Sequence, residues 1–154
     1  MQIVQELLKD ENIIFVAIGP NYATLPLWKN VAEKISGRLK VLGILPYEEV
    51  ATYIAAADVV LDSFPMGGGT ALIDAVSQNR PVLFVDSILG QFDYLLDSVA
   101  QCSDFHNLVV RARDLVYDEI LQQKNVAEMK KRLADNCCIV VWKNKLPQVY
   151  HQVG

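Results

Sequence analysis

Short apolar runs alternate with segments of helical spacing along the first half of the chain. Four runs have the length and composition of strands: residues 13–18, 38–42, 59–61 and 82–85. Between them, apolar residues recur every three or four positions, which is typical of helices that cover a sheet with one face. The predicted helices are residues 3–8, 25–35, 46–57 and a helix that begins at Thr70. This alternation predicts an α/β fold with a parallel sheet.

The second half of the chain has a less regular pattern. Residues 92–99 predict a helix, and residues 108–110 fit either a strand or the start of a helix. Two charged helices are expected at residues 114–123 and 126–136, with a break between them. Residues 137–142 fit a strand or a helix, and the tail from Pro147 is expected to be helical or frayed.

The chain is organised around residues 58–86, which form a strand, a glycine loop, a helix and a second strand. Pro65 ends the first strand because proline has no N–H to donate, and the three glycines that follow leave the backbone unconstrained. Thr70 begins the helix, and Pro81 opens the next apolar run. Because such crossovers are right-handed, residues 59–61 and 82–85 are expected to be adjacent parallel strands in the centre of the sheet.

The glycine loop has the composition of an anion site. A helix start presents N–H groups without partners and the positive end of the helix dipole, and glycines let a phosphate approach them. Thr70 adds a hydroxyl there, whereas Asp74 would repel a phosphate and suits a neutral diol such as a ribose. The alternative is a tight turn in which Thr70 only caps the helix.

Composition excludes several classes of function. The 154 residues are one domain, and 52% apolar with 21% charged residues is typical of a globular protein. A net charge of −4 does not attract nucleic acid or an anionic membrane. No apolar run reaches the roughly 20 residues of a membrane helix, and the N-terminus has no signal-peptide pattern.

The cysteines indicate a reducing, cytoplasmic environment. Cys102, Cys137 and Cys138 are odd in number and two are adjacent, which does not suit a disulfide framework. We expect all three to be buried as small apolar residues. They lack the spacing of zinc ligands, and His106 and His151 add no metal pattern, so no metal and no cofactor is expected.

Residues 38–135 resemble the nucleotide-binding core of the C-terminal domain of GT-B glycosyltransferases. In that family a strand ends in an Asp/Ser/Pro stretch, a loop with Gly and Thr opens a helix, an acidic residue follows, and a Pro-Val strand closes the unit. The pattern is most similar to the O-GlcNAc transferase-like branch, where the acidic residue precedes the proline by the interval that separates Asp74 from Pro81. Residues 45–49, Leu-Pro-Tyr-Glu-Glu, fit as well. Where the family has His-Thr-Thr, this chain has Gly69-Thr70-Ala71. Where the family has a histidine that faces the base, this chain has Val50.

The resemblance implies a Rossmann-like three-layer sandwich that binds a nucleotide-sugar donor, with uracil as the implied base. The implied diphosphate site is Gly67, Gly68, Gly69, Thr70 and Ala71. Asp74 would bind the ribose, and the implied nucleobase site is Leu45, Tyr47 and Val50. The sugar would pass to a protein or glycan acceptor without a metal ion.

The resemblance also implies that residues 1–154 are the donor half of a longer chain. Members of the family open this domain with a strand ahead of the first helix, and they carry a separate N-terminal domain with the acceptor site and the catalytic base. Neither is expected within these residues, so no catalytic residue is assigned and the isolated chain is expected to be inactive.

Two other classes of function fit the same residues. One is a degenerate nucleotide-binding module used for protein contacts, which the changes at Val50, Gly69 and Ala71 favour. The other is a nucleotide-sugar epimerase of the same fold, an enzyme without an acceptor. Binding of UDP, GDP and UDP-sugars separates the module from the enzymes, and product analysis separates transferase from epimerase.

Overall fold

A computed structural model describes residues 2–19, 25–35, 37–64, 70–85, 97–141 and 143. The chain alternates helices and strands as far as β4, which confirms the predicted α/β class. In chain order the elements are α1 (Gln2–Leu7), β1 (Phe15–Ile18), α2 (Pro26–Lys34), β2 (Leu39–Leu42), α3 (Tyr47–Ala56), β3 (Val60–Leu61), α4 (Thr70–Ser77), β4 (Val82–Val85), β5 (Gln101–Cys102), α5 (Phe105–Tyr117) and α6 (Glu119–Cys137).

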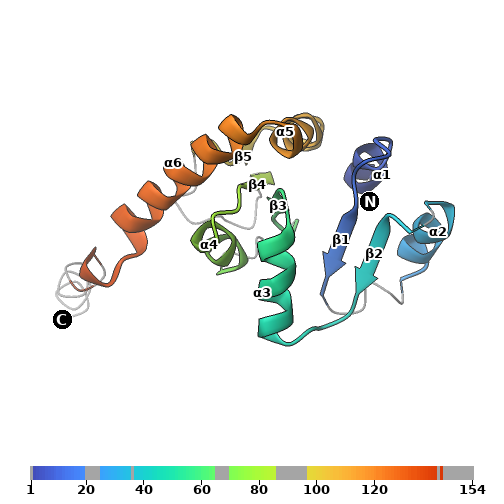
Figure 1. Ribbon diagram of the computed structural model, residues 1–154, viewed down its shortest axis with the longest axis horizontal. Helices are drawn as coiled ribbons and strands as arrows, with labels where there is room; N and C mark the ends of the chain where they lie inside the picture. Colours follow the sequence, from blue (N-terminus) through green and yellow to red (C-terminus); the bar gives the residue numbers. More distant parts are fainter. Residues whose placement is uncertain are drawn as a thin grey trace, which may run out of the picture.

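All the strand pairs that the structure describes are parallel. β1 pairs with β2, and β4 pairs with β3 on one side and β5 on the other. The register places Val60 opposite Val82 and Leu61 opposite Leu83, which confirms the predicted adjacency of these two strands. Among the described strands β4 is central but β3 lies at the edge of its three-stranded sheet, so the predicted central position is wrong for β3. In the view of Figure 1, β1 lies between β2 and β3.

Two apolar clusters form the core, and alternate residues of the strands serve each of them. Leu83 belongs to the first cluster, together with side chains of α1, α2 and α5. Its neighbours Val82 and Phe84 belong to the second cluster, with side chains of α3, α4 and α6. Because successive strand residues point to opposite faces, the two clusters cover opposite faces of the sheet that contains β4. Val82, Leu83 and Phe84 are at most 1% exposed, so β4 is the most deeply buried strand.

The helices in the second half differ from the prediction. The expected break at residues 124–125 is wrong, because α6 runs through it without interruption. The break lies at Asp118, whose carboxylate accepts hydrogen bonds from the N–H groups of Ile120 and Leu121 and thereby caps α6. Residues 108–110, which fitted either state, belong to α5.

Of the helix predicted at residues 92–99, the first five residues lie outside the described part. Residues 97–99 form a turn, so the prediction is wrong for its C-terminal end. The prediction also missed β5, which is only two residues long.

Asn125 explains why α6 continues where a break was expected. Its side chain is buried, with 3% exposed, and it lies beside the first residue of β4. Its Oδ1 accepts from the Val82 N–H at 3.0 Å, and its Nδ2 donates to the Val82 carbonyl at 3.1 Å and to the Val99 carbonyl at 3.4 Å. The side-chain amide therefore bonds the backbone groups that Val82 presents next to the start of β5, as a strand residue would.

In the part of the chain that the structure describes, no helix combines the length and the apolar character needed to cross a membrane.

Candidate functional site

The candidate site lies where the chain leaves the carboxyl ends of β2 and β3. Residues 43–46 lead from β2 into α3, and residues 62–64 leave β3 in the direction of α4. β1 and β2 form a two-stranded parallel sheet, and β3, β4 and β5 form a three-stranded parallel sheet. Open α/β sheets bind ligands outside the carboxyl ends of their strands.

The structure brings together two residues that the sequence assigned to different parts of a nucleotide. Tyr47 is the first residue of α3, and Asp74 is one turn into α4. The Tyr47 hydroxyl donates a hydrogen bond of 3.3 Å to Asp74 Oδ1. This contact joins the predicted base-binding and ribose-binding residues across the starts of two helices.

The hydrogen bond leaves both side chains with binding capacity. A carboxylate offers about four lone-pair sites, so Asp74 keeps acceptors for further hydroxyl groups. The Tyr47 side chain is exposed, with 63% of its surface accessible, and its ring is open to stacking. The negative charge of Asp74, and then its hydrogen bond, raise the pKa of the Tyr47 phenol above its ordinary value.

Thr70 and Ala71 form the exposed start of α4. Thr70 and Asp74 are four residues apart, so they lie on the same side of the helix. Leu72, Ala75 and Val76 are buried in the second core cluster and hold α4 against the sheet. The start of α4 is thereby fixed to the core while its first residues stay accessible.

Of the other predicted residues, Leu45 and Val50 are partly buried. Val50 packs against the second core cluster, so part of its side chain serves the core. Gly67, Gly68 and Gly69 lie outside the described residues, and their role stays a prediction.

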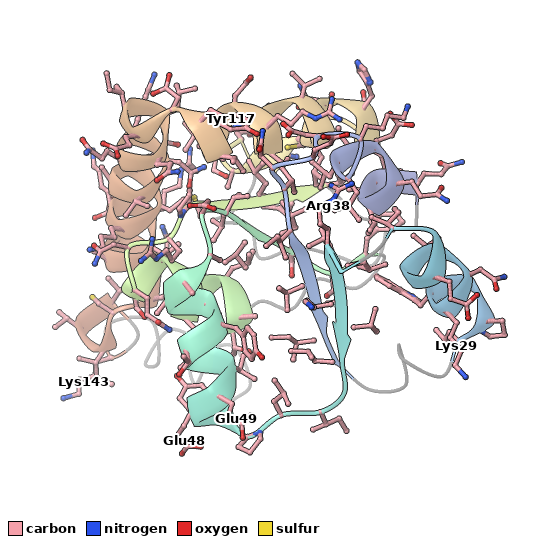
Figure 2. All side chains as sticks on the ribbon, turned by 45° about the vertical axis from the view of Figure 1, so that its right-hand side comes forward. Lys29, Arg38, Glu48, Glu49, Tyr117 and Lys143 are labelled. Carbon is pink, nitrogen blue, oxygen red and sulfur yellow. The ribbon has the colours of Figure 1, made fainter. Side chains whose placement is uncertain are left out.

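The predicted set contains no basic side chain, and its one charge is the carboxylate of Asp74. Glu48 and Glu49 lie in the first turn of α3, and Figure 2 shows their side chains pointing away from the body of the molecule. A phosphate at this site would therefore depend on backbone N–H groups and the dipole of α4.

An aromatic pair that was not predicted from the sequence lies at the carboxyl ends of β3 and β5. Phe64 follows β3, and Phe105 is the first residue of α5. Their ring centroids are 4.9 Å apart with an angle of 88° between the planes, an edge-to-face contact. Phe64 remains 52% exposed and adds an apolar surface at this end of the sheet. The signal available in the sequence was an aromatic residue three positions after the apolar run at residues 59–61.

A hollow of about 170 Å³ between α5 and α6 is an alternative site. Its lining includes Arg111, Asp114, Lys124 and Asn125, none of which belongs to the predicted set. Small-molecule pockets usually measure about 300–1,000 Å³, so this hollow is too small for a sugar nucleotide. Arg111 is already engaged there, because its guanidinium donates to the carbonyls of Val99 and Gln101.

The cysteines give no second site. Cys102 is buried, and burial raises the pKa of its thiol, which disfavours the reactive thiolate. Cys137 is exposed and Cys138 is only partly buried, so the expectation that all three are buried holds for Cys102 alone and is wrong for Cys137. Among the described residues, no group of three or more His, Cys, Asp or Glu side chains is arranged to hold a metal ion.

No protein-family model matches the sequence, and neither the curated proteins nor the solved structures contain a match.

Proposed function

We propose that this chain is the donor-binding half of a GT-B glycosyltransferase, a Rossmann-like three-layer sandwich that holds a UDP-sugar. The hydrogen bond between Tyr47 and Asp74 carries the proposal. It brings two predicted ligand residues, which are 27 positions apart in the sequence, to one place at the carboxyl ends of parallel strands. The position of this contact outside the carboxyl ends of β2 and β3 supports the same location, because open α/β sheets bind ligands at that edge.

Each part of the donor has a matching group at this site. The diphosphate would lie at the start of α4, where N–H groups without helical partners and the helix dipole favour an anion. Asp74 would accept hydrogen bonds from the ribose hydroxyls, and the exposed ring of Tyr47 would stack on the base. Charge builds up on the diphosphate as the glycosidic bond breaks, and N–H groups held by a buried helix stabilise that charge without reorganising.

Isothermal titration calorimetry with UDP, GDP, UDP-glucose and UDP-GlcNAc tests the proposal. We expect weak UDP binding, with Kd nearer millimolar than micromolar, or on the order of −4 to −6 kcal/mol. Thr70→Ala and Asp74→Asn should each weaken binding roughly 5- to 150-fold, since each removes ligand hydrogen bonds of about 1–3 kcal/mol. Tyr47→Phe should weaken binding less than Tyr47→Ala, because it keeps the ring.

Matched variants elsewhere on the fold serve as controls. Asp58→Asn changes an exposed aspartate at the amino end of β3, the opposite edge of the sheet. Tyr117→Phe removes a hydroxyl that bonds Asp10, and Figure 2 shows Tyr117 on α5 at the other end of the molecule from Glu48. Neither should change UDP affinity. If UDP does not bind at millimolar concentration, the proposal fails and the alternative of a protein-contact module is supported.

A further inference from the structure

Three exposed apolar side chains gather where α5 ends and α6 begins. Tyr117, the last residue of α5, is 59% exposed, and Ile120 and Leu121 in the first turn of α6 are 77% and 39% exposed. The two helix ends are tied together, because Gln122 Nε2 donates to the Leu115 carbonyl at 2.6 Å. In Figure 1, α5 and α6 form the upper border of the molecule. Apolar residues that gather on a surface in this way often mark a contact with a partner.

The surface beside these side chains is hollowed. A hollow of about 410 Å³ is lined by Tyr117 and Leu121 together with the charged residues Arg113, Asp114 and Asp118. The smaller hollow between α5 and α6 adjoins it, because Asp114 and Leu121 line both. The two hollows therefore form one groove along the junction of α5 and α6, which we call the α5–α6 groove.

The exposed charges at the α5–α6 groove are mainly carboxylates. Asp114 and Asp118 line it, and Glu119 follows directly, and all three residues are exposed. Within the described part of the chain, none of these three carboxylates forms an ion pair. They are therefore available to cationic groups of a partner.

The cations of the α5–α6 groove offset this charge only in part. Arg111 and Arg113 are partly buried, and their guanidinium groups donate to backbone carbonyls. Of the described residues that line the two hollows, Lys124 alone is an exposed cation. The groove therefore attracts cationic groups and disfavours anionic ligands.

Tyr117 is held in place while its ring stays accessible. Its hydroxyl donates a hydrogen bond of 2.6 Å to Asp10 Oδ2, and Asp10 Oδ1 accepts from the Asn12 N–H at 3.0 Å. The polar end of the ring is thereby anchored to the turn after α1. A side chain that is ordered before binding loses little conformational freedom when a partner arrives, and tyrosine is common among the residues that dominate binding energies.

We propose that the α5–α6 groove binds an amphipathic helix of a partner protein that carries lysine or arginine residues beside its apolar stripe. The stripe packs on Tyr117, Ile120 and Leu121, and the basic residues face the exposed carboxylates. Helices that dock into grooves do so through apolar residues at positions i, i+3, i+4 and i+7, with charged residues at the rim setting specificity.

The charge of the groove argues against a second copy of this chain as the occupant. A symmetric pairing would place the same carboxylates of both copies opposite each other, and like charges repel. The groove is also separate from the candidate nucleotide site, because Figure 2 shows Tyr117 at the other end of the molecule from Glu48. The inference therefore does not depend on nucleotide binding.

A synthetic amphipathic helix with leucines at i, i+3, i+4 and i+7 and lysines beside them is the probe. Fluorescence anisotropy of the labelled peptide, titrated with the 154-residue chain, measures its affinity. We expect a Kd of about 10–100 μM at low salt that weakens as salt screens the charges. A control peptide with glutamates in place of the lysines should bind roughly tenfold more weakly or not at all.

Matched variants locate the binding surface. Ile120→Ser and Ile139→Ser both replace exposed isoleucines, 77% and 64% exposed, but Ile139 lies beyond the opposite end of α6. Ile120→Ser should weaken binding roughly fivefold or more because it removes apolar area from the contact, and Ile139→Ser should leave the affinity unchanged. Asp114→Asn should weaken binding and reduce its salt dependence, whereas Asp135→Asn should do neither.

A test without variants follows the amide spectrum of the unmodified chain. The lysine peptide should shift the amides of Tyr117, Ile120 and Leu121 and leave those of Tyr47 and Asp74 in place. Equal affinity for the lysine and glutamate peptides would overturn the proposal, and so would equal effects of the two isoleucine variants or shifts outside the groove. A doubled mass of the chain alone in sedimentation, abolished by Ile120→Ser, would assign the groove to a second copy and would also overturn it.

Discussion

Replacing Asn125 by alanine is expected to destabilise the protein strongly, although Asn125 lies in the middle of a helix and far from any terminus. The substitution removes the bonds to the N–H and the carbonyl of Val82 and the longer bond to the Val99 carbonyl. Val82 is 0% exposed, so water does not replace the lost partners without opening the core. A buried backbone group left without a partner costs about 1–3 kcal/mol.

Two such groups at Val82 give an expected loss of about 2–6 kcal/mol, with the 3.4 Å contact adding little. That is a large fraction of the roughly 5–15 kcal/mol by which a typical domain is stable. Urea unfolding followed by far-UV circular dichroism measures the loss as a lower midpoint with an unchanged m-value. In hydrogen exchange, the rate of the Val82 amide should rise more than the rate of any other amide of β4.

Asn136→Ala is the matched control. Its side-chain amide donates at 2.8 Å to the carbonyl of Arg132 within the same helix, and it is only partly buried. We expect a loss below about 1 kcal/mol, because water can replace this bond. If both variants lose the same free energy of unfolding, the side chain of Asn125 does not bond the backbone of β4 in the way that a neighbouring strand would, and the reasoning is refuted.

Further predictions concern the candidate site, a helix cap and catalysis. Asp74→Asn should lower the pKa of the Tyr47 phenol toward its ordinary value of 10.0, because Asp74 is the main cause of its rise. The folded state favours the neutral phenol, so the contribution of this contact to the free energy of unfolding is complete below pH 10 and is lost as the pH rises through the folded-state pKa. If the phenolate absorbance titration of the variant is unchanged, the contact between Tyr47 and Asp74 is contradicted. Asp118→Ala should cost about 1 kcal/mol in urea unfolding by removing the cap of α6, and Asp135→Ala, exposed within the same helix, should cost less; equal losses would argue against the cap. If this chain is the donor-binding half of a glycosyltransferase, as proposed, it should transfer no labelled sugar from UDP-GlcNAc or UDP-glucose to peptide acceptors, because the other half would have to exclude water and position the acceptor; sustained turnover would place catalytic residues within these 154 positions.

The first half of the fold follows closely from its sequence pattern. The boundaries from α1 to β4 differ from the predicted ones by at most two residues at the ends that the structure describes. Each strand there is a short apolar run, and each helix has a clear apolar face, so local pattern and tertiary packing agree. Gly37 has a φ of 76° in the turn after α2, a left-handed conformation that is typical of glycine at the end of a helix.

The second half was harder to predict because tertiary contacts decide its structure. An asparagine near a charged run favours a break, but Asn125 is held inside α6 by its bonds to β4. β5 has two residues, too few to show a strand period. The cap at Asp118, in contrast, carries a local signal, an aspartate directly before a helix that begins with glutamate.

For the site, the sequence supplied the residues but not their arrangement. The meeting of Tyr47 and Asp74 depends on how α3 and α4 pack, and only the resemblance to a family suggested it. Phe64 and Phe105 are 41 positions apart, and no local pattern in the sequence predicts that their rings are in contact. Such long-range contacts are fixed by the sheet order, which a single sequence does not specify.

Titrating UDP into the isotope-labelled 154-residue chain and following its amide spectrum shows whether a nucleotide binds at the starts of α3 and α4. We expect the amides of Tyr47, Thr70, Ala71 and Asp74 to shift together with one apparent Kd near the millimolar range. Amides of α6 that face away from this edge, such as those of Lys124 and Glu128, should not move. Shifts confined to the hollow between α5 and α6, or no shift at 10-fold excess over about 1 mM, would contradict a nucleotide site at the carboxyl ends of β2 and β3.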